Sequence, residues 1–486
     1  MDPSRTPVVV GAAQVRGERG GTREPLALVL DAVRAAGEAR LLARADTVLA
    51  VGVASWSYDS VAARVGTAVG AVPRHRTDSP TGGHWPARLL DEAAARIAAG
   101  ESQVALVVGG EAQAARRALG DRDPVEAGWT PPAEPPPFDA DAFGSPQQLA
   151  AGLLLPTRAY AVFENRLQAD LGLTAEESAQ WSARLYADLS QVAARNPAAW
   201  SPEVRTPEEV ATPTAANRMV CEPYVRAVNA MPNVDQAAAV VVTSLAVARD
   251  LGVAHVSHVW GGAGVDDVVD LLARDAYGAS RALSACLDAA LERSPVRPGL
   301  VDVYSCFPVV PKLAALHLGL PRDAVLSATG GHASFGGPLN SYSLHAVVAA
   351  HERLRDGEDA ALVHANGGLL TYQHAVLLGR RPHPDGYVGD PVPRRLDPAG
   401  PGVAEPADTD LLVEAATVEH GREGGPAQAF VVGRTPEGLR AAAWTDEAAV
   451  ARQLSLAALP PGVRTHVGRR VRVRAGFGAA VVTEVL

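Results

Sequence analysis

The stretch Gly330–Ser343 reads GGHASFGGPLNSYS, and the predicted fold is built outward from it. It follows an apolar strand and turn at Leu300–Phe307 (LVDVYSCF) and precedes a helix predicted to begin near Leu344. Its four glycines allow the backbone to turn sharply and to approach a ligand closely, because glycine has no Cβ. Amide groups at the start of the following helix would then face an anionic or carbonyl oxygen. The stretch therefore predicts either a tight loop or one wall of a ligand site.

The sequence on both sides of this stretch alternates apolar strands with amphipathic helices, which is typical of an α/β fold. In the later part of the chain we predict a strand at Ala254–Val259, a helix at Ser280–Arg293, a strand at Leu300–Tyr304, a helix at Leu344–Leu354, and strands at Ala360–His364 and Tyr372–Leu378. In the earlier part we predict a strand at Pro7–Ala12, a helix at Pro25–Leu42, a strand at Thr47–Val53, a helix at Pro86–Ala99, and strands at Gln103–Val108 and Gln236–Ser244. The two orders are comparable, so an internal duplication is predicted.

Two regions depart from this alternation. Residues 120–145 are rich in proline and acid, and helices follow, with Thr174 and Glu177 as a capping box ahead of a helix at Ala179–Arg195. After a Pro/Gly/Asp-rich linker at 382–407 come short β-like runs at Leu411–Val418, Ala429–Val432, Leu439–Ala443, Val471–Arg474 and Ala479–Val482. We predict an N-terminal half (1–119 plus 236–250), an inserted loop domain (120–235), a C-terminal half (251–381) and a small β-barrel-like domain (382–486).

Composition excludes several classes of function. The chain has 486 residues, of which 47% are hydrophobic and 20% charged, enough for several packed domains. A net charge of −10 argues against nucleic acid or an anionic membrane as the main partner. The three cysteines, Cys221, Cys286 and Cys306, lack metal-ligand spacing and fit a reducing compartment. With neither a signal-like start nor an apolar run of roughly eighteen residues, a cytoplasmic protein without membrane insertion or metal is predicted.

Four stretches, in their order and spacing, resemble the thiolase superfamily. Pro80–Gly110 (PTGGHWPARLLDEAAARIAAGESQVALVVGG) resembles the segment that holds the nucleophilic cysteine at a helix start. Tyr304–Phe307 (YSCF) resembles the NEAF or HDCF box, Gly330–Ser343 the GG…GHP…G segment, and Ala365–Gly368 (ANGG) the CxGG turn. The chain is most similar to sterol-carrier-protein-type, acetyl-CoA acetyltransferase-like thiolases and thiolase-like relatives with an added C-terminal domain. The resemblance implies a duplicated thiolase fold in α/β/α/β/α layers, a helical loop-domain insertion and an OB-like barrel.

The departures from the family's pattern bear on the chemistry. The position of the nucleophilic cysteine falls on or near Gly83, and Tyr304 replaces the asparagine or histidine of the box. Gly337 occupies the position of the histidine in GHP, and Ala365 occupies the position of the cysteine in CxGG. Thiolysis needs a thiolate to carry the acyl group, a histidine to activate it and a second cysteine to move the α-proton. We therefore predict that cysteine-dependent thiolysis is absent.

The resemblance also indicates which remaining residues surround the pocket. The candidate catalytic residues are Tyr304, His332, His84, Asn366 and Tyr342, and the candidate ligand-binding residues are Gly83, Gly331, Gly336, Gly337, Asn340 and Gly367. Each has a purely structural alternative: the histidines border turns, and Tyr304 and Tyr342 could simply fill space. Packed, hydrogen-bonded roles are favoured for His345 and His374, and a structural role for Cys306.

Three functions stay open at this point. The leading one is an acyl-CoA-binding, acyltransferase-like protein that is not a thiolase, with a coenzyme A thioester as substrate or ligand and no other cofactor. The first alternative is an aldol or retro-aldol reaction on an acyl-CoA, with Tyr304 as acid or base. The second is a non-catalytic CoA-thioester-binding or scaffold protein. A pocket lined by Tyr304, His84 and His332 would favour an enzyme, whereas a pocket filled by them would favour a scaffold.

Two further expectations concern the surface. The thiolase loop domain contacts CoA. Candidate phosphate contacts are therefore Arg158, Arg166 and Arg184, with ordinary surface arginine as the alternative.

Thiolases usually dimerise through an edge strand just before the nucleophile, and here that segment reads VPRHRTDSPTGG. Proline and charge blunt an edge strand against pairing, so a monomer or a weakened thiolase-type dimer is predicted.

Overall fold

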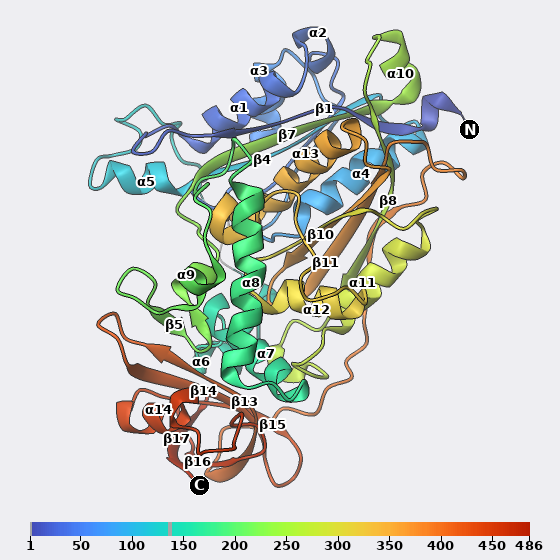
Figure 1. Ribbon diagram of the computed structural model, residues 1–486. Coiled ribbons are helices and arrows are strands. Elements are labelled where there is room, and N and C mark those ends of the chain that lie inside the picture. The colour runs from blue at the N-terminus through green and yellow to red at the C-terminus, as the bar shows by residue number, and fades with distance from the viewer. Residues whose placement is uncertain (1, 135–138) are drawn as a thin grey trace.

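A computed structural model describes residues 2–134 and 139–486 and shows layers of helices and sheet above a separate small barrel (Figure 1). Residues 135–138, part of the stretch predicted to be irregular, lie outside the described residues. The predicted fold class is confirmed, because two similar half-sheets enclose a central pair of helices and a closed barrel follows.

The first half-sheet contains five strands in the order β3-β2-β4-β7-β1. Their bounds are β3 His75–Asp78, β2 Thr47–Ala50, β4 Val104–Ala112, β7 Asp235–Ser244 and β1 Pro7–Arg16. β2 runs parallel to β3 and β4, whereas β7 is antiparallel to both β4 and β1. All ten residues of β7 and all nine of β4 are buried, as expected for strands covered on both faces.

The second half-sheet repeats this order as β9-β10-β11-β8. Its strands are β9 Leu300–Val303, β10 Ala360–Gly367, β11 Tyr372–Gly379 and β8 Ser257–Asp266. β9 is parallel to β10, and β11 is antiparallel to β10 and β8, so the directions match those of β2, β4, β7 and β1. A short pairing of β1 with β8 joins the two half-sheets. The predicted duplication is therefore confirmed.

Helices form three layers around the half-sheets, as Figure 1 shows. The central layer consists of α4 (Trp85–Ala99) and α13 (Tyr342–Arg355), which contact strands of both half-sheets. The outer layers are α1 (Pro25–Ala36) with α3 (Val61–Ala68), and α11 (Arg281–Glu292) with α12 (Val309–His317). The first outer helix was predicted to continue to Leu42, which is wrong, since extended backbone at Gly37 and Glu38 separates α1 from α2 (Ala39–Leu42).

The inserted region carries helices that lie outside the sheet. These are α6 (Pro146–Ala150), α7 (Pro156–Asp170), α8 (Ala175–Ala193) and α9 (Pro207–Ala211), followed by the short strands β5 (Met219–Cys221) and β6 (Tyr224–Val225). The predicted capping box between Thr174 and Glu177 is confirmed at the start of α8. The proposed boundaries fall beside α5 (Gln113–Leu119), at the start of β7, and just after α10 (Leu245–Asp250).

One buried ion pair connects this region to the second half. Lys312, the only lysine of the chain, lies on α12 and places Nζ 2.5 Å from Oε1 of Glu164 on α7. Nζ also donates to the carbonyl oxygen of Ser178 at 3.0 Å and lies 4.9 Å from the centre of the Trp181 ring. Removing one partner would leave a buried charge without compensation, so the pair holds α7, α8 and α12 in one arrangement.

The C-terminal region forms a closed five-stranded barrel. Its strands are β13 (Thr409–His420), β14 (Pro426–Arg434), β15 (Arg440–Thr445), β17 (Ala480–Val485) and β16 (Arg470–Arg474), with β13 pairing back onto β14. Helix α14 (Ala448–Leu454) packs on the barrel. Each predicted β-like run lies within or overlaps one of these strands, and HGREGG forms the predicted hairpin turn. Residues 390–395 of the predicted linker instead form β12 (Asp390–Arg395), which pairs with β8.

The barrel rests on the inserted helices. Arg158 of α7 forms a 2.5 Å ion pair with Glu419 of β13, and Asn165 donates to the carbonyl oxygen of Ala416 at 2.9 Å. β5 extends the barrel sheet by pairing Cys221 with Glu419. Arg158 and Arg166, suggested as phosphate contacts, already have carboxylate partners in Glu419 and Asp170.

None of the helices in the described ranges has both the length and the apolar character that a membrane crossing requires.

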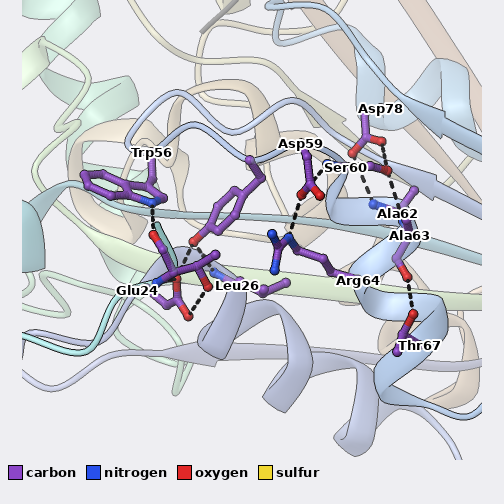
Figure 2. A network of polar contacts seen from close by, with 12 residues as sticks. Glu24, Leu26, Trp56, Asp59, Ser60, Ala62, Ala63, Arg64, Thr67 and Asp78 are labelled. Carbon is purple, nitrogen blue, oxygen red and sulfur yellow. Dashed lines mark hydrogen bonds and ion pairs between the residues drawn. The ribbon is translucent and has the colours of Figure 1, made fainter. Parts of the chain in front are cut away.

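Strand β3 ends the first half-sheet, and its last residue is tied to the neighbouring helix (Figure 2). Oδ1 of Asp78 accepts the backbone N–H of Ala62 at 3.1 Å, and Oδ2 accepts the hydroxyl of Ser60 at 2.5 Å. These bonds hold a carboxylate against the N-terminus of α3, where it is electrostatically favoured. The strand is short and carries charge along its outer edge, which disfavours pairing with a second copy.

We therefore expect the protein to be a monomer at low micromolar concentration. The measurement is light scattering coupled to size-exclusion chromatography over a tenfold dilution series. A mass near 50.3 kDa at every concentration is the expected result. A mass twice as large that persists on dilution would show that this edge pairs after all.

Candidate functional site

The start of helix α4 is the centre of the candidate site. Gly83 and His84 immediately precede the helix, and an added Cβ at Gly83 would lie 2.4 Å from the hydroxyl oxygen of Tyr304. The same Cβ would lie 2.6 Å from the carbonyl oxygen of Asn366. The phenol of Tyr304 therefore occupies the space into which the side chain of a nucleophile at position 83 would project.

Tyr304 follows strand β9 and is 8% exposed. Burial, followed by the neighbouring Cys306 and Tyr342, raises its pKa well above the usual value for tyrosine. Tyr304 is therefore a neutral phenol that fills space and keeps a proton to donate.

His332 lies beside Tyr304 in a stack of rings. Its ring centroid is 4.2 Å from that of Tyr304 and 3.5 Å from that of Tyr342, and the side chain is 2% exposed. Burial lowers its pKa well below the usual value, so the imidazole is neutral. Nδ1 accepts the backbone N–H of Ser305 at 3.4 Å, which places the remaining proton on Nε2. Nε2 is buried and has no partner among the described residues.

The imidazole of His332 also lies next to Gly337, the position that stands for the catalytic histidine of the family. An added Cβ at Gly337 would lie 3.5 Å from Cδ2 of His332 and 3.4 Å from the carbonyl oxygen of Met231, which are ordinary contacts. The inserted region covers this space, because Ala230 donates its N–H to Cys306 and Met231 to His332, both at 3.0 Å. Gly337 in turn donates its N–H to the carbonyl oxygen of Met231 at 2.9 Å.

His84 packs on the other side of Gly83. An added Cβ at Gly367 would lie 2.2 Å from Nδ1 of His84, so glycine at 367 is what permits this imidazole to sit there. The ring stacks on Tyr372 with centroids 5.1 Å apart, and the residue is 6% exposed. Burial, with smaller contributions from His374 and Arg88, lowers the pKa of His84 to about 3.

The two candidate asparagines are engaged in structural hydrogen bonds. Asn366 donates from Nδ2 to the hydroxyl of Tyr160 at 2.8 Å and accepts at Oδ1 from Gln373 at 2.7 Å. Asn340 accepts the N–H of Gly82 at 2.9 Å and donates to the carbonyl oxygen of Gly52 at 2.9 Å. Both side chains hold loops around Gly83 in place, and their polar groups already have partners.

The remaining candidates support the glycine-rich stretch itself. The hydroxyl of Tyr342 accepts the N–H of Gly331 at 3.1 Å. Gly331 and Gly336 have φ values of +74° and +121°, which disfavour other residues. An added Cβ at Gly336 would also lie 2.5 Å from Oε1 of Gln236. These residues shape the turn that carries His332.

Other buried residues surround these candidates. His345 and His374 are packed and hydrogen-bonded as predicted, His345 to Gln14 and His374 to Asp91, both at 3.1 Å. The sequence analysis missed Tyr160, which stacks on Phe307 with centroids 4.9 Å apart, and the covering segment at 230–231. No local sequence signal points to either, because their contacts are made across the fold.

Comparison with known proteins shows which families the chain resembles. A model of the additional C-terminal domain of thiolase-like protein type 1 matches residues 391–476. The crystal structure of a monomeric SCP2-thiolase like protein type 1 from Mycobacterium smegmatis shares 28% identity over 100% of both chains, with a TM-score of 0.83. The resemblance to thiolases with an additional C-terminal domain is confirmed.

More distant structures share only the fold with this protein. The Ltp2-ChsH2(DUF35) aldolase shares 20% identity, covering 77% of this chain and 98% of that chain with a TM-score of 0.60. Human mitochondrial 3-ketoacyl-CoA thiolase shares 18% identity, covering 78% of this chain and 100% of that chain with a TM-score of 0.55. No curated protein matches the sequence.

The contact between Gly83 and Tyr304 leads to a first prediction for this site. Gly83→Ala should lower the free energy of unfolding by about 1–3 kcal/mol, because the new methyl group meets the phenol. In a Tyr304→Ala background the same change should cost less than in the wild type, the remaining cost coming from the Asn366 carbonyl oxygen 2.6 Å from the new methyl group, and a double-mutant cycle by urea unfolding measures the difference. Gly337→Ala is the matched control and should be close to neutral, since its Cβ has room. Equal costs in both backgrounds would contradict the filled-site geometry.

The buried histidine next to Gly83 leads to a second prediction. The pKa of His84 is about 3 in the folded protein, so below about pH 6.5 only the unfolded chain takes up this proton. Its contribution to stability is complete above about pH 6.5 and is lost progressively as the pH falls toward 3, by about 1.4 kcal/mol per unit. Between about pH 7.5 and 5.5, His84→Gln should therefore lose about 1.4 kcal/mol less than the wild type in urea unfolding.

The control for this experiment is His255→Gln, because His255 is exposed. Its unfolding free energy should follow the wild-type pH dependence. If His84→Gln also follows the wild type, His84 is not buried in the neutral state.

Proposed function

We propose that this thiolase-like protein binds an acyl-CoA thioester and does not carry out cysteine-dependent thiolysis. The observation that carries the proposal is the position of the Tyr304 hydroxyl. Its oxygen would lie 2.4 Å from a Cβ added at Gly83. A covalent acyl-enzyme requires a nucleophile whose side chain can reach the thioester carbon. Here position 83 is a glycine without a side chain, and the phenol of Tyr304 occupies the space that such a side chain would need.

Hydrogen-bond donors support thioester binding. Helices α4 and α13 both begin at the site, so the positive ends of two helix dipoles meet there. The Nε2–H group of His332 is buried near Gly337 and lacks a partner among the described residues. A thioester carbonyl oxygen that accepts this proton would satisfy a buried donor that otherwise costs stability.

A second candidate function is aldol or retro-aldol chemistry on an acyl-CoA. The observation in its favour is that Tyr304 and His332 lie together, with ring centroids 4.2 Å apart. Retro-aldol cleavage needs a base for the β-hydroxyl and a donor for the enolate. Burial raises the pKa of Tyr304 and lowers that of His332, so neither group readily accepts a proton at neutral pH. Binding without turnover is therefore the function that we favour.

We test the proposal by calorimetric titration with CoA, acetyl-CoA, acetoacetyl-CoA and 3-hydroxybutyryl-CoA, and by chromatography of the mixtures. Acyl-CoA should bind more tightly than CoA, and acetoacetyl-CoA with added CoA should not be cleaved. His332→Phe should reduce the preference for acyl-CoA about tenfold, because one hydrogen bond to the carbonyl is lost. His255→Ala is the control and should leave the preference unchanged.

The other outcomes separate the alternatives. Cleavage of 3-hydroxybutyryl-CoA by the wild type but not by Tyr304→Phe would establish the aldolase. Equal binding of CoA and acyl-CoA without turnover would establish a scaffold that recognises only the nucleotide. Absence of all binding would overturn the proposal.

A further inference from the structure

A second concave site lies between the inserted region and the C-terminal barrel. It has a volume of about 1020 Å³ and is lined by the first turns of α8, by residues 213–223, by the tip of the β13–β14 hairpin and by the end of α14 with the residues that follow. In Figure 1 the hairpin tip lies beside β5 and α9. Small-molecule sites usually enclose about 300–1,000 Å³, so this cleft is large enough for one.

The cleft is remote from the candidate site described above. Ala179 of α8 lines the cleft, whereas Leu189 of the same helix lies against Gly331, whose added Cβ would be 2.7 Å from Leu189 Cδ1. Ten residues of helix span roughly 15 Å, since each residue advances about 1.5 Å. A ligand in the cleft would therefore contact neither Tyr304 nor His332 directly.

Three arginines from separate elements converge on this cleft. Arg218 precedes β5, Arg422 lies in the hairpin turn and Arg452 lies on α14. Among the described residues, none of the three forms an ion pair with a carboxylate. Arg218 does donate from one nitrogen to the carbonyl oxygen of Met219 at 3.0 Å. Elsewhere on the barrel, Arg434 and Arg440 are both paired with Glu414. Arginine forks without a carboxylate partner are suited to bind a carboxylate or phosphate group.

The acidic residues of the cleft do not cancel this charge. Glu222 is buried, and its carboxylate accepts hydrogen bonds from Ser455 Oγ at 2.6 Å and from the N–H of Leu456 at 2.7 Å. His420 Nε2 lies 2.7 Å from the same carboxylate. Glu423, in the exposed turn, is the other acidic residue of the lining.

The rest of the lining is mainly apolar. Met219, Leu456 and three prolines form walls, and the alanines at the start of α8 leave room between them. An inorganic anion would satisfy the arginines but would leave these walls in water. A ligand with both an anionic group and an apolar body would satisfy both parts of the cleft.

We propose that this cleft binds a fatty carboxylate, with the apolar chain against the walls and the carboxylate on Arg218, Arg422 and Arg452. The barrel then serves as one half of a ligand site whose other half is the inserted region. This site is separate from the acyl-CoA site proposed above, and neither depends on the other.

The test is calorimetric titration of the full chain with decanoate, decanol and inorganic phosphate. Decanoate should bind at one saturable site. Decanol, which lacks the carboxylate, and phosphate, which lacks the apolar chain, should each bind at least about tenfold more weakly. Arg422→Ala/Arg452→Ala should weaken decanoate binding at least about tenfold, and Arg218→Ala gives an independent second variant. Arg470→Ala is the matched control, since this exposed arginine lies on β16 of the same barrel outside the cleft.

Four results would overturn the proposal. These are absence of decanoate binding, equal binding of decanol, unchanged binding by both cleft variants, and equal loss in Arg470→Ala. Acetyl-CoA binding should be unaffected by the cleft variants. A parallel loss of acetyl-CoA binding would mean that the cleft belongs to the acyl-CoA site and that no separate site exists.

Discussion

The structure depends on the burial of two helices between two half-sheets. Every residue of α13 from Tyr342 to His351 is buried, and α4 buries apolar side chains toward both half-sheets. A polar side chain that is buried on such a helix costs free energy unless it finds a partner. Asp91 in the middle of α4 shows the consequence, because Tyr387 and His374 both bind its carboxylate. The two helices also begin at the same place, which directs their N-termini toward the candidate site.

At that place, side chains occupy the volume that a reaction would need. Tyr304 lies over Gly83, His84 lies against Gly367, and His332 stacks between Tyr304 and Tyr342. Burial keeps both imidazoles neutral and the phenol protonated, which suppresses proton transfer while leaving hydrogen-bond donors in place. The site therefore contains two helix N-termini and a buried Nε2–H donor, while position 83 has no side chain that could form a covalent bond. The loop-domain segment at 230–231 closes the same space from the other side.

The barrel is integrated with the inserted region through polar contacts. Arg158 with Glu419 and Asn165 with Ala416 hold α7 against β13, and Arg440 is fully buried between Glu414 and carbonyl oxygens of residues 272 and 274. Such contacts give the two parts a defined orientation. A defined orientation is what allows a cleft between them to have a fixed shape and to collect arginines from both sides.

The sequence by itself determined the fold class of this protein, since periodic apolar patterns predict most strands of the two halves and of the barrel, and their repeated order reveals the duplication. The patterns did not predict β12 or the end of α1 at Ala36. Local chemistry likewise predicted the capping box at Thr174 and the hairpin turn of the barrel. The absence of cysteine chemistry is also a prediction from the sequence, because it rests only on which residue types are missing. Only the tertiary structure decided what fills the vacated space. Gly83, Tyr304 and Gly367 are far apart in the chain, and whether a phenol meets a missing Cβ depends on packing across the two halves, which no local pattern encodes.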